Sequence, residues 1–242
     1  LITDFGLKDG NVGVMKGVIW SIAPQAQIAD ITHQIRPQNV MEGSLALGRA
    51  APYFPPDTVH VAVVDPGVGT QRRPIAARLG ARFFVGPDNG LCTVMVEQAR
   101  RQGSETRFYH LDQPRYWLPE VSHVFHGRDL FAPVAAHLCN GVPLEALGTP
   151  VDDPVLLELP QPERTPQGWR GQVLLVDAFS LRPSNFGFCE TTDFVTFKDL
   201  GHFNDGPMKT TNVTSPKHGA VIQLTKAEAD KLASHWGLEL KW

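Results

Sequence analysis

The stretch TVHVAVVDPGVGTQRR, residues 58–73, sets the fold class of this chain. It begins as a nearly continuous apolar run, which is typical of a strand buried on both faces of a sheet. The run ends at Asp65, turns on Pro66 and two glycines, and then supplies Arg72 and Arg73. The loop is short enough for an arginine to fold back toward Asp65, which would keep that carboxylate ionised. A structural ion pair is the simplest interpretation of this loop.

Strand-like and helix-like segments alternate on both sides of this stretch. Strands are expected at 1–4, 26–32 and 58–65, helices at 11–23, 39–54, 91–103 and 129–141, and a hairpin around Gly80 at 73–90. This alternation predicts an α/β domain with a mostly parallel sheet. Ligands of such sheets bind beyond the carboxyl ends of the strands, where Asp4 and Asp65 are expected.

Composition divides the chain into three parts. Residues 1–140 carry the α/β pattern, and residues 141–170 form a proline-rich segment without a helical period, which predicts an irregular connector. Residues 171–242 are expected to form a small, mainly β domain with a strand at 171–179. A helix at 225–237 is expected there as well, because Thr225 and Glu228 form a capping box.

Charge, hydropathy and cysteine content exclude several classes of protein. The net charge is -3 and the lysines and arginines are scattered, so we expect no nucleic-acid partner. No stretch reaches the roughly 18 apolar residues of a membrane span, so we expect no membrane partner. The three cysteines form no CxxC pair, which favours a reducing compartment and predicts a cytoplasmic protein.

The segment HVFHGRDLFAPVAAHL, residues 123–138, gathers polar side chains at a helix entrance. His126, Arg128 and Asp129 stand where free backbone N–H groups favour anions and polar ligands. The histidine spacing matches no zinc pattern, so no metal is expected. Asp88 and Asn89, in VGPDNGL, fit a tight turn. No P-loop, GxGxxG or GxSxG motif is present.

Four motifs, in this order, resemble one family. They are TDFGLKDGNVGVMKGVI, VVDPGVGTQRR, VGPDNGL and FHGRDLFAPVAAHL. Together they are similar to the S-adenosyl-L-methionine (SAM) hydroxide adenosyltransferases, or SAM hydrolases, which are related to fluorinase and chlorinase. The resemblance covers roughly residues 1–180. It implies an N-terminal α/β domain, a small C-terminal β-barrel-like domain, and a homotrimer whose active sites lie between subunits.

The resemblance also implies an activity and a set of site residues. The family hydrolyses SAM to adenosine and L-methionine by attack of water or hydroxide on the ribose C5′. It uses no metal and no cofactor, since SAM is the substrate. Its polar triad matches Asp65, Arg72 and His126. Its substrate contacts match Asp4, Asp9, Asn11, Phe125, Asp177 and Phe179.

A halogenase is the less favoured interpretation within the family. Fluorinase carries tyrosines at the positions of Asp65 and His126 and a serine at that of Gly127. An anionic Asp65 would also repel a halide ion. These differences favour the hydrolase.

The second domain departs from the family pattern. The run DAFSLRPSN has Ser180 in place of a glycine and Leu181 in place of an asparagine that contacts substrate, and a leucine forms no side-chain hydrogen bond. Beyond about residue 180 the sequence diverges. An active hydrolase, a member with altered specificity and an adenosine- or SAM-binding protein without turnover therefore all stay open.

Overall fold

The computed structural model describes residues 1–165, 168–171, 187–190 and 198–202 of the 242-residue chain. The chain divides into two compact units, Leu1–Leu159 and Pro160–Trp242. The first unit contains η4 (Leu144–Leu147), which packs on β3 and β5, and β6 (Thr149–Pro150), which is the last strand of the sheet. The domain limits expected from composition, at residues 140 and 170, stay predictions.

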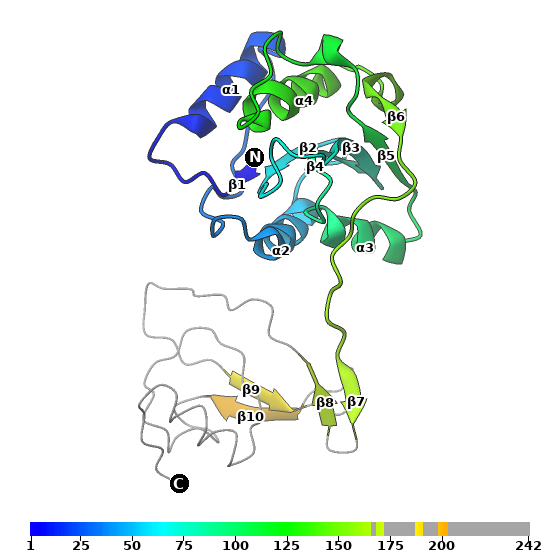
Figure 1. Ribbon diagram of the computed structural model, residues 1–242. Helices are drawn as coiled ribbons and strands as arrows, with labels where there is room; N and C mark the ends of the chain where they lie inside the picture. The colour runs from blue at the N-terminus through cyan, green and yellow to red at the C-terminus, as the bar shows by residue number, and fades with distance from the viewer. Residues whose placement is uncertain (166–167, 172–186, 191–197, 203–242) are drawn as a thin grey trace. The chain divides into compact units, whose positions relative to one another are not determined.

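A six-stranded sheet forms the centre of the first unit (Figure 1). Its strand order is β1-β2-β4-β3-β5-β6. The strands not yet given bounds are β1 (Ile2–Thr3), β2 (Val59–Val63), β3 (Pro74–Leu79), β4 (Arg82–Pro87) and β5 (Thr106–His110). β1, β2 and β4 are parallel neighbours, whereas β3, β5 and β6 pair antiparallel.

The expectation of an α/β domain is confirmed, and the expectation of a mostly parallel sheet is wrong. The predicted hairpin around Gly80 forms, with Leu79 opposite Arg82, and a tight hairpin makes β3 antiparallel to β4. β5 then pairs antiparallel with β3. The sheet is therefore mixed, and its parallel half carries Asp4 and Asp65.

Four α-helices cover the two faces of the sheet. They are α1 (Asn11–Ile22), α2 (Val40–Ala50), α3 (Thr93–Arg101) and α4 (Ala132–Cys139). α1 and α4 pack together on one face, and α2 and α3 pack together on the other (Figure 1). The β2 side chains alternate between the two cores, with Val61 and Val63 beneath α1 and α4, and Ala62 and Val64 beneath α2 and α3. This double burial explains the apolar run that opens residues 58–73.

The four helices predicted within residues 1–141 are confirmed, with small changes at their ends. α2 continues into the short helix η1 (Ala51–Tyr53), and α3 is followed by Gly103 with a φ of 64°. α4 is preceded by a π-helical turn, η3 (Gly127–Phe131), and a short 3-10 helix, η2 (Pro114–Tyr116), lies earlier in the chain. π-helical turns occur often at functional sites, and this one begins beside His126.

The strand expected at residues 26–32 does not form. Its end lies beside β1, through the isolated bridge between Thr32 and Ile2 and through backbone hydrogen bonds from Ile31 N–H to the Leu1 carbonyl at 2.8 Å and from Thr3 N–H to the Thr32 carbonyl at 3.1 Å. The pairing extends no further, because β1 has just two residues. β5 was not anticipated, since TRFYH lacks a clear alternation of apolar and polar residues. It lies between β3 and β6 and completes the antiparallel half of the sheet.

The described part of the second unit consists of two antiparallel strand pairs. β7 (Glu163–Thr165) pairs with β8 (Gly168–Arg170), and β9 (Gly187–Glu190) pairs with β10 (Lys198–His202). The expected strand at 171–179, apart from Gly171, and the expected helix at 225–237 lie outside the described residues. The β-barrel-like fold of this unit stays a prediction.

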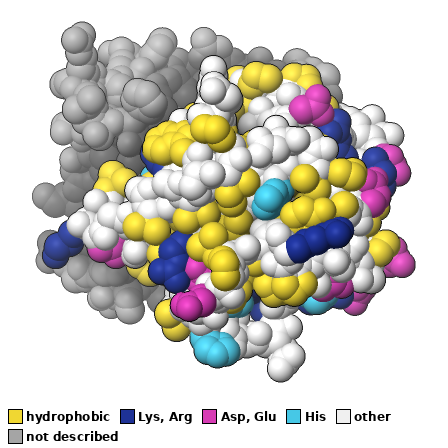
Figure 2. Space-filling model, turned by 90° about the horizontal axis from the view of Figure 1, so that it is seen from above, with side chains coloured by type: hydrophobic (Ala, Val, Ile, Leu, Met, Phe, Trp, Pro, Cys, Tyr) yellow, Lys and Arg dark blue, Asp and Glu magenta, His cyan; other side chains and the backbone are white. Residues whose placement is uncertain are grey.

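The surface of the first unit mixes charges of both signs. On the face drawn in Figure 2, lysine, arginine and acidic side chains of the described residues are scattered among hydrophobic ones. No helix in the described part of the chain is long and apolar enough to cross a membrane.

Candidate active site

Three parallel strands bring three aspartates to one edge of the sheet. β1, β2 and β4 are neighbours in this order, so their carboxyl ends meet at the same edge. Asp4 follows β1, Asp65 follows β2 and Asp88 follows β4. Polar chemistry is therefore concentrated where open α/β sheets bind their ligands.

Asp65, Arg72 and His126 form a closed cluster at this edge. The Arg72 Nε donates to Asp65 Oδ1 at 3.1 Å, and its Nη2 donates to Asp65 Oδ2. The same Nη2 lies 3.1 Å from His126 Nδ1. The side chains of Arg72 and Asp65 are only 7% and 5% exposed, so the ion pair is buried. The arginine that returns to Asp65 is thus Arg72, and it also reaches a residue 54 positions further along the chain.

The loop between Asp65 and Arg72 is built from tight turns. Val68 N–H donates to the Asp65 carbonyl at 3.3 Å, and Thr70 N–H and Oγ1 donate to the Gly67 carbonyl at 3.2 and 2.7 Å. Gly69 has a φ of 76°, and a Cβ there would lie 2.5 Å from the carbonyl oxygen of His123. Only glycine fits both requirements, since it tolerates positive φ and leaves room for the neighbouring backbone. The loop can therefore close against the segment that carries His126.

The residues on either side of His126, Phe125 and Gly127, pack against aromatic and sulfur-containing side chains. Phe125 and Phe5 meet edge to face with ring centroids 5.7 Å apart. A Cβ on Gly127 would lie 3.2 Å from Met15 Sδ and 3.4 Å from both rings. The loop after β1, the first helix and the π-helical turn therefore pack closely at this position.

The ionisation of His126 follows from its surroundings. Burial lowers its pKa below the ordinary value, and the positive charge of Arg72 lowers it further. A guanidinium can only donate, so the contact with Arg72 makes Nδ1 the acceptor and leaves the proton of the neutral ring on Nε2. The cluster thus contains a buried ion pair and a neutral histidine that carries its N–H on Nε2.

Arg72 retains one unused donor. Its Nη1 is buried and has no hydrogen-bond partner among the described residues. The guanidinium also lies over the Phe131 ring, 5.5 Å from the ring centroid. A buried N–H without a partner is costly, about 1 to 3 kcal/mol, unless a ligand or water accepts from it. The cluster can therefore bind an additional oxygen atom.

The other site residues expected from the sequence lie in several places. Asp4 accepts from the Gln38 backbone N–H at 2.7 Å, at the same sheet edge as Asp65. Asp9 accepts from the backbone and side-chain amides of Asn11 at 3.4 and 2.9 Å, before the start of α1. Asp9 and Asn11 thus bind each other, and Asp4 binds the Gln38 backbone, rather than the cluster. Asp177, Phe179 and the divergent positions Ser180 and Leu181 lie outside the described residues.

Arg128 and Asp129 do not join the cluster. They form an ion pair with each other, with Arg128 Nε 2.5 Å from Asp129 Oδ1, and Arg128 lies over the Phe125 ring. Asp129 is fully buried and accepts from the Ser122 backbone N–H at 2.8 Å. This pair fixes the loop that leads to His126. No group of three or more His, Cys, Asp or Glu residues in the described part of the chain is arranged to hold a metal ion.

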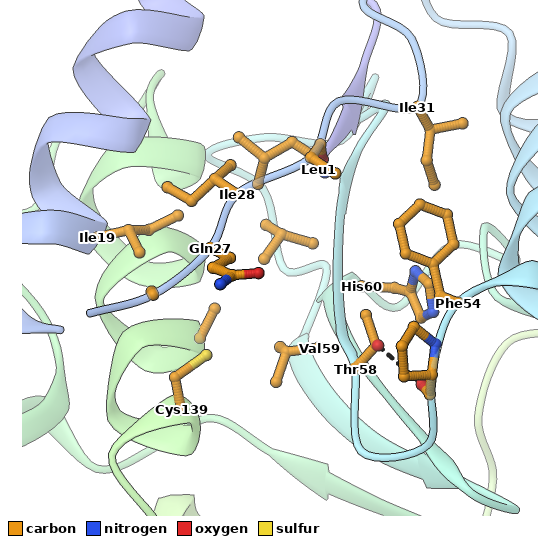
Figure 3. A pocket seen from close by; sticks show the side chains of 15 residues that line it. Leu1, Ile19, Gln27, Ile28, Ile31, Phe54, Thr58, Val59, His60 and Cys139 are labelled. Carbon is orange, nitrogen blue, oxygen red and sulfur yellow. Dashed lines mark hydrogen bonds between the residues drawn. The ribbon is translucent and has the colours of Figure 1, made fainter. Parts of the chain in front are cut away.

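A separate hollow lies at the opposite edge of the sheet. It has a volume of about 430 Å³ and is lined mainly by apolar side chains, among them Ile28, Val59 and Phe54 (Figure 3). His60 packs edge to face against Phe54, with ring centroids 5.3 Å apart. Val59 and His60 begin β2, whereas Asp65 follows its carboxyl end. This hollow is therefore not part of the Asp65 cluster.

Comparisons with known proteins show what the chain is similar to. Residues 1–148 match the family described as "SAM hydroxide adenosyltransferase N-terminal domain". The (R)-S-adenosyl-L-methionine hydrolase of Salinispora arenicola (strain CNS-205) is 44% identical over 179 residues, which cover 73% of this chain and 67% of that protein. The fluorinase of Actinopolyspora mzabensis is 26% identical over 192 residues, which cover 69% of this chain and 63% of that protein.

A solved structure shares both fold and sequence with the chain. The crystal structure of an uncharacterized conserved protein from Thermotoga maritima superposes with a TM-score of 0.69 and 42% sequence identity. The match covers 74% of this chain and 67% of that one.

Proposed function

Because the chain belongs to the SAM hydroxide adenosyltransferase family, we propose that it hydrolyses SAM to adenosine and L-methionine. The observation that carries this proposal is the closed cluster of Asp65, Arg72 and His126 at the carboxyl edge of the sheet. Its ion pair is buried, His126 is half-buried, and Arg72 Nη1 has no hydrogen-bond partner among the described residues, so the cluster can bind one more oxygen atom.

The reaction is a displacement at the ribose C5′. The oxygen of a water molecule forms a bond to C5′, the bond from C5′ to the sulfonium sulfur breaks, and its electron pair leaves with methionine. The leaving group departs as a neutral thioether and needs no acid. The difficulty lies in the nucleophile, which must be separated from bulk water, aligned with the breaking bond and deprotonated.

The cluster is suited to hold that water molecule. Each Asp65 oxygen accepts one hydrogen bond from Arg72, and a carboxylate oxygen has a second lone pair, so Asp65 can still accept from a water O–H. The neutral His126 and the partnerless Nη1 of Arg72 supply further N–H donors in the same cluster. Among these groups Asp65 can accept from the water, so the proton that the water loses is transferred toward the Asp65 carboxylate. Arg72 stabilises the hydroxide character that develops on the oxygen.

The remaining site residues take the roles that the family resemblance implies. Asp4 binds the ribose hydroxyls, Asp9 and Asn11 make further substrate contacts, and Phe125 packs against the nucleoside. For Asp9 this role requires the bond with Asn11 to rearrange when substrate binds, because the two residues hold each other. Asp177 binds the methionine ammonium group, and Phe179 lines the adenine pocket.

The assembly and the limits of the domains are part of the same proposal. We expect a cytoplasmic homotrimer in which a residue 1–140 domain of one subunit and a residue 171–242 domain of its neighbour form each site, with residues 141–170 as the connector. Activity should then fall on dilution. A mixture of subunits carrying separate lesions in the two domains should regain part of the wild-type activity.

A SAM-dependent halogenase is disfavoured by the same cluster. A halide nucleophile would approach the buried Asp65 carboxylate, and only one of the two charges there is positive. The fluorinase compared above is also much less similar to the chain than the hydrolase, at 26% against 44% identity.

Incubation of the purified chain with SAM, followed by chromatography, tests the proposed activity. We expect adenosine and methionine in equal amounts, in EDTA as well as without it, and no product from His126→Gln. Halide should not change the products. If SAM is recovered intact while adenosine raises the thermal midpoint, the chain is a binding protein and the proposal is wrong.

A further inference from the structure

Asp88, the third aspartate at the sheet edge, binds two distant segments at once, those of Arg73 and Val155. Its side chain is 1% exposed. Asp88 Oδ2 accepts from Arg73 Nε at 2.9 Å and lies 2.7 Å from Arg73 Nη2. Asp88 Oδ1 accepts from the Val155 backbone N–H at 2.8 Å, and the Asp88 N–H donates to the Arg73 carbonyl at 2.9 Å. A surface turn would not need a buried carboxylate with every oxygen engaged.

Arg73 connects this carboxylate to the candidate active site through the chain itself. Successive side chains of extended backbone point to opposite sides, and here Arg72 reaches Asp65 and His126 while Arg73 reaches Asp88. The side chain and the carbonyl of Arg73 are both bonded to Asp88. Any movement of the Arg73 backbone therefore moves the base of the Arg72 side chain.

A strap formed by residues 153–157 completes the arrangement. Arg73 Nη1 donates to Asp153 Oδ1 and its Nη2 donates to the Asp153 carbonyl, both at 2.8 Å. Leu157 N–H donates to Thr93 Oγ1 at 2.8 Å, and a Cβ on Gly90 would lie 2.6 Å from the Leu157 side chain. The strap thus closes over the turn that follows β4, and Asp88 is the buried group to which strap and arginine both attach.

We propose that Asp88 is a positioning residue for the hydrolysis, which fixes Arg72 against Asp65 and His126 by holding Arg73. This inference rests on the proposed function, because positioning matters only if the Arg72 cluster performs the reaction. Asp88 touches no member of the cluster directly in the described contacts, so it acts through Arg73. A misplacement of about 1 Å in a catalytic group can lower a rate by roughly 100-fold.

The test uses Asp88→Asn, which keeps the size of the side chain but turns one acceptor into a donor that faces Arg73. We expect kcat for SAM to fall by about 10- to 100-fold with a small change in KM. Asp57→Asn is the matched control, because the exposed Asp57, which precedes β2, forms an ion pair at 2.7 Å with Arg78 of β3. Its kcat should stay within about twofold of the wild type, as for most exposed ion pairs.

A second measurement separates positioning from a loss of stability. NMR titration of His126, assigned with His126→Gln, reports its local charges, which include Arg72, Asp65, Asp129 and His123. In Asp88→Asn the pKa of His126 should rise toward its ordinary value, because Arg72 lies further from the ring. Val96→Ala, on the buried face of α3, should lower stability without changing the loop, and should leave this pKa and kcat unchanged.

The outcomes are distinguishable. If the wild type does not turn over SAM, the proposed function is wrong, while the His126 titration still decides whether Asp88 positions Arg72. If folded Asp88→Asn keeps both the wild-type kcat and the wild-type His126 titration, the inference is overturned. Should Asp88→Asn fail to fold, Arg73→Lys replaces it, because a lysine retains the charge but cannot engage Asp88 and Asp153 with the same fork geometry. The same changes, smaller in size, are then expected, and wild-type values would again overturn the inference.

Discussion

Replacing Asp65 by alanine should affect stability as well as turnover. The carboxylate accepts two hydrogen bonds from Arg72, and both side chains are almost fully buried. In Asp65→Ala the guanidinium would stay buried over the Phe131 ring, with Nδ1 of His126 as its one remaining hydrogen-bond partner among the described contacts, since Nη1 already lacks one. Breaking a buried ion pair from one side costs about 3 to 5 kcal/mol.

The double variant Asp65→Ala/Arg72→Met separates the ion pair from the chemistry. Removal of both charges leaves no buried ion unpaired, and an apolar side chain of similar length fills part of the space, so most of the lost stability should return. Turnover should not return, because the acceptor for the water is still missing. Single variants and the double variant form a cycle whose coupling free energy is measured by urea unfolding.

The reasoning fails on either of two results. One is an Asp65→Ala protein whose free energy of unfolding lies within about 1 kcal/mol of the wild type, which would mean that the pair is not buried in solution. The other is a double variant that still forms adenosine at the wild-type rate, which would remove Asp65 and Arg72 from the reaction.

Three further predictions follow from single positions. Gly69→Ala should reduce turnover at least tenfold, because its Cβ would lie 2.5 Å from the His123 carbonyl oxygen. Gly103 has a similar positive φ but open space around it, so Gly103→Ala should lose only about 1 to 2 kcal/mol of stability and keep its rate. Equal turnover rates in the two variants would contradict this. Turnover should fall as the pH drops through the lowered pKa of His126, below 6.5, because the protonated ring would be repelled by the neighbouring Arg72 guanidinium. A turnover rate that rises between pH 7 and pH 5 would refute this prediction. Burial lowers the pKa of His60 to about 4, so protonation favours the unfolded chain below pH 6.5 and removes about 3 kcal/mol of stability by pH 4. Between pH 7 and 4, the free energy of unfolding of His60→Gln, measured with urea, should therefore fall by about 3 kcal/mol less than that of the wild type. An equal fall in both proteins would contradict the assignment.

Local patterns predicted the fold where a segment is decided by its own burial and turns. The helical spacing of residues 11–22 and the glycine at position 80 each specify a structure without help from distant residues. By contrast, β5 pairs with β3 on the side away from β4, and no periodicity within one strand records which strand will be its neighbour. For the same reason residues 26–32 resemble a strand although they find almost no ladder to join.

The candidate site was predictable to a different degree at each position. Asp65 and Arg72 are seven residues apart, so the loop alone suggests their contact. The contact of Arg72 with His126 spans 54 residues and follows only from the family resemblance. At Asp88 the sequence predicts only a turn, because the run Pro-Asp-Asn-Gly has the residues that tight turns prefer. Its burial and its bonds to Arg73 and Val155 arise from segments that are far away in sequence, which local reasoning does not reach.

A crystal structure of the protein with adenosine and methionine bound tests the central claim most directly. The 5′ oxygen of adenosine is the oxygen of the water that attacked, so its position marks where that water was held. The account predicts this oxygen within hydrogen-bond distance of Asp65, with Arg72 or His126 as a second partner. A 5′ oxygen bound elsewhere, with the three side chains directed away from C5′, would contradict it.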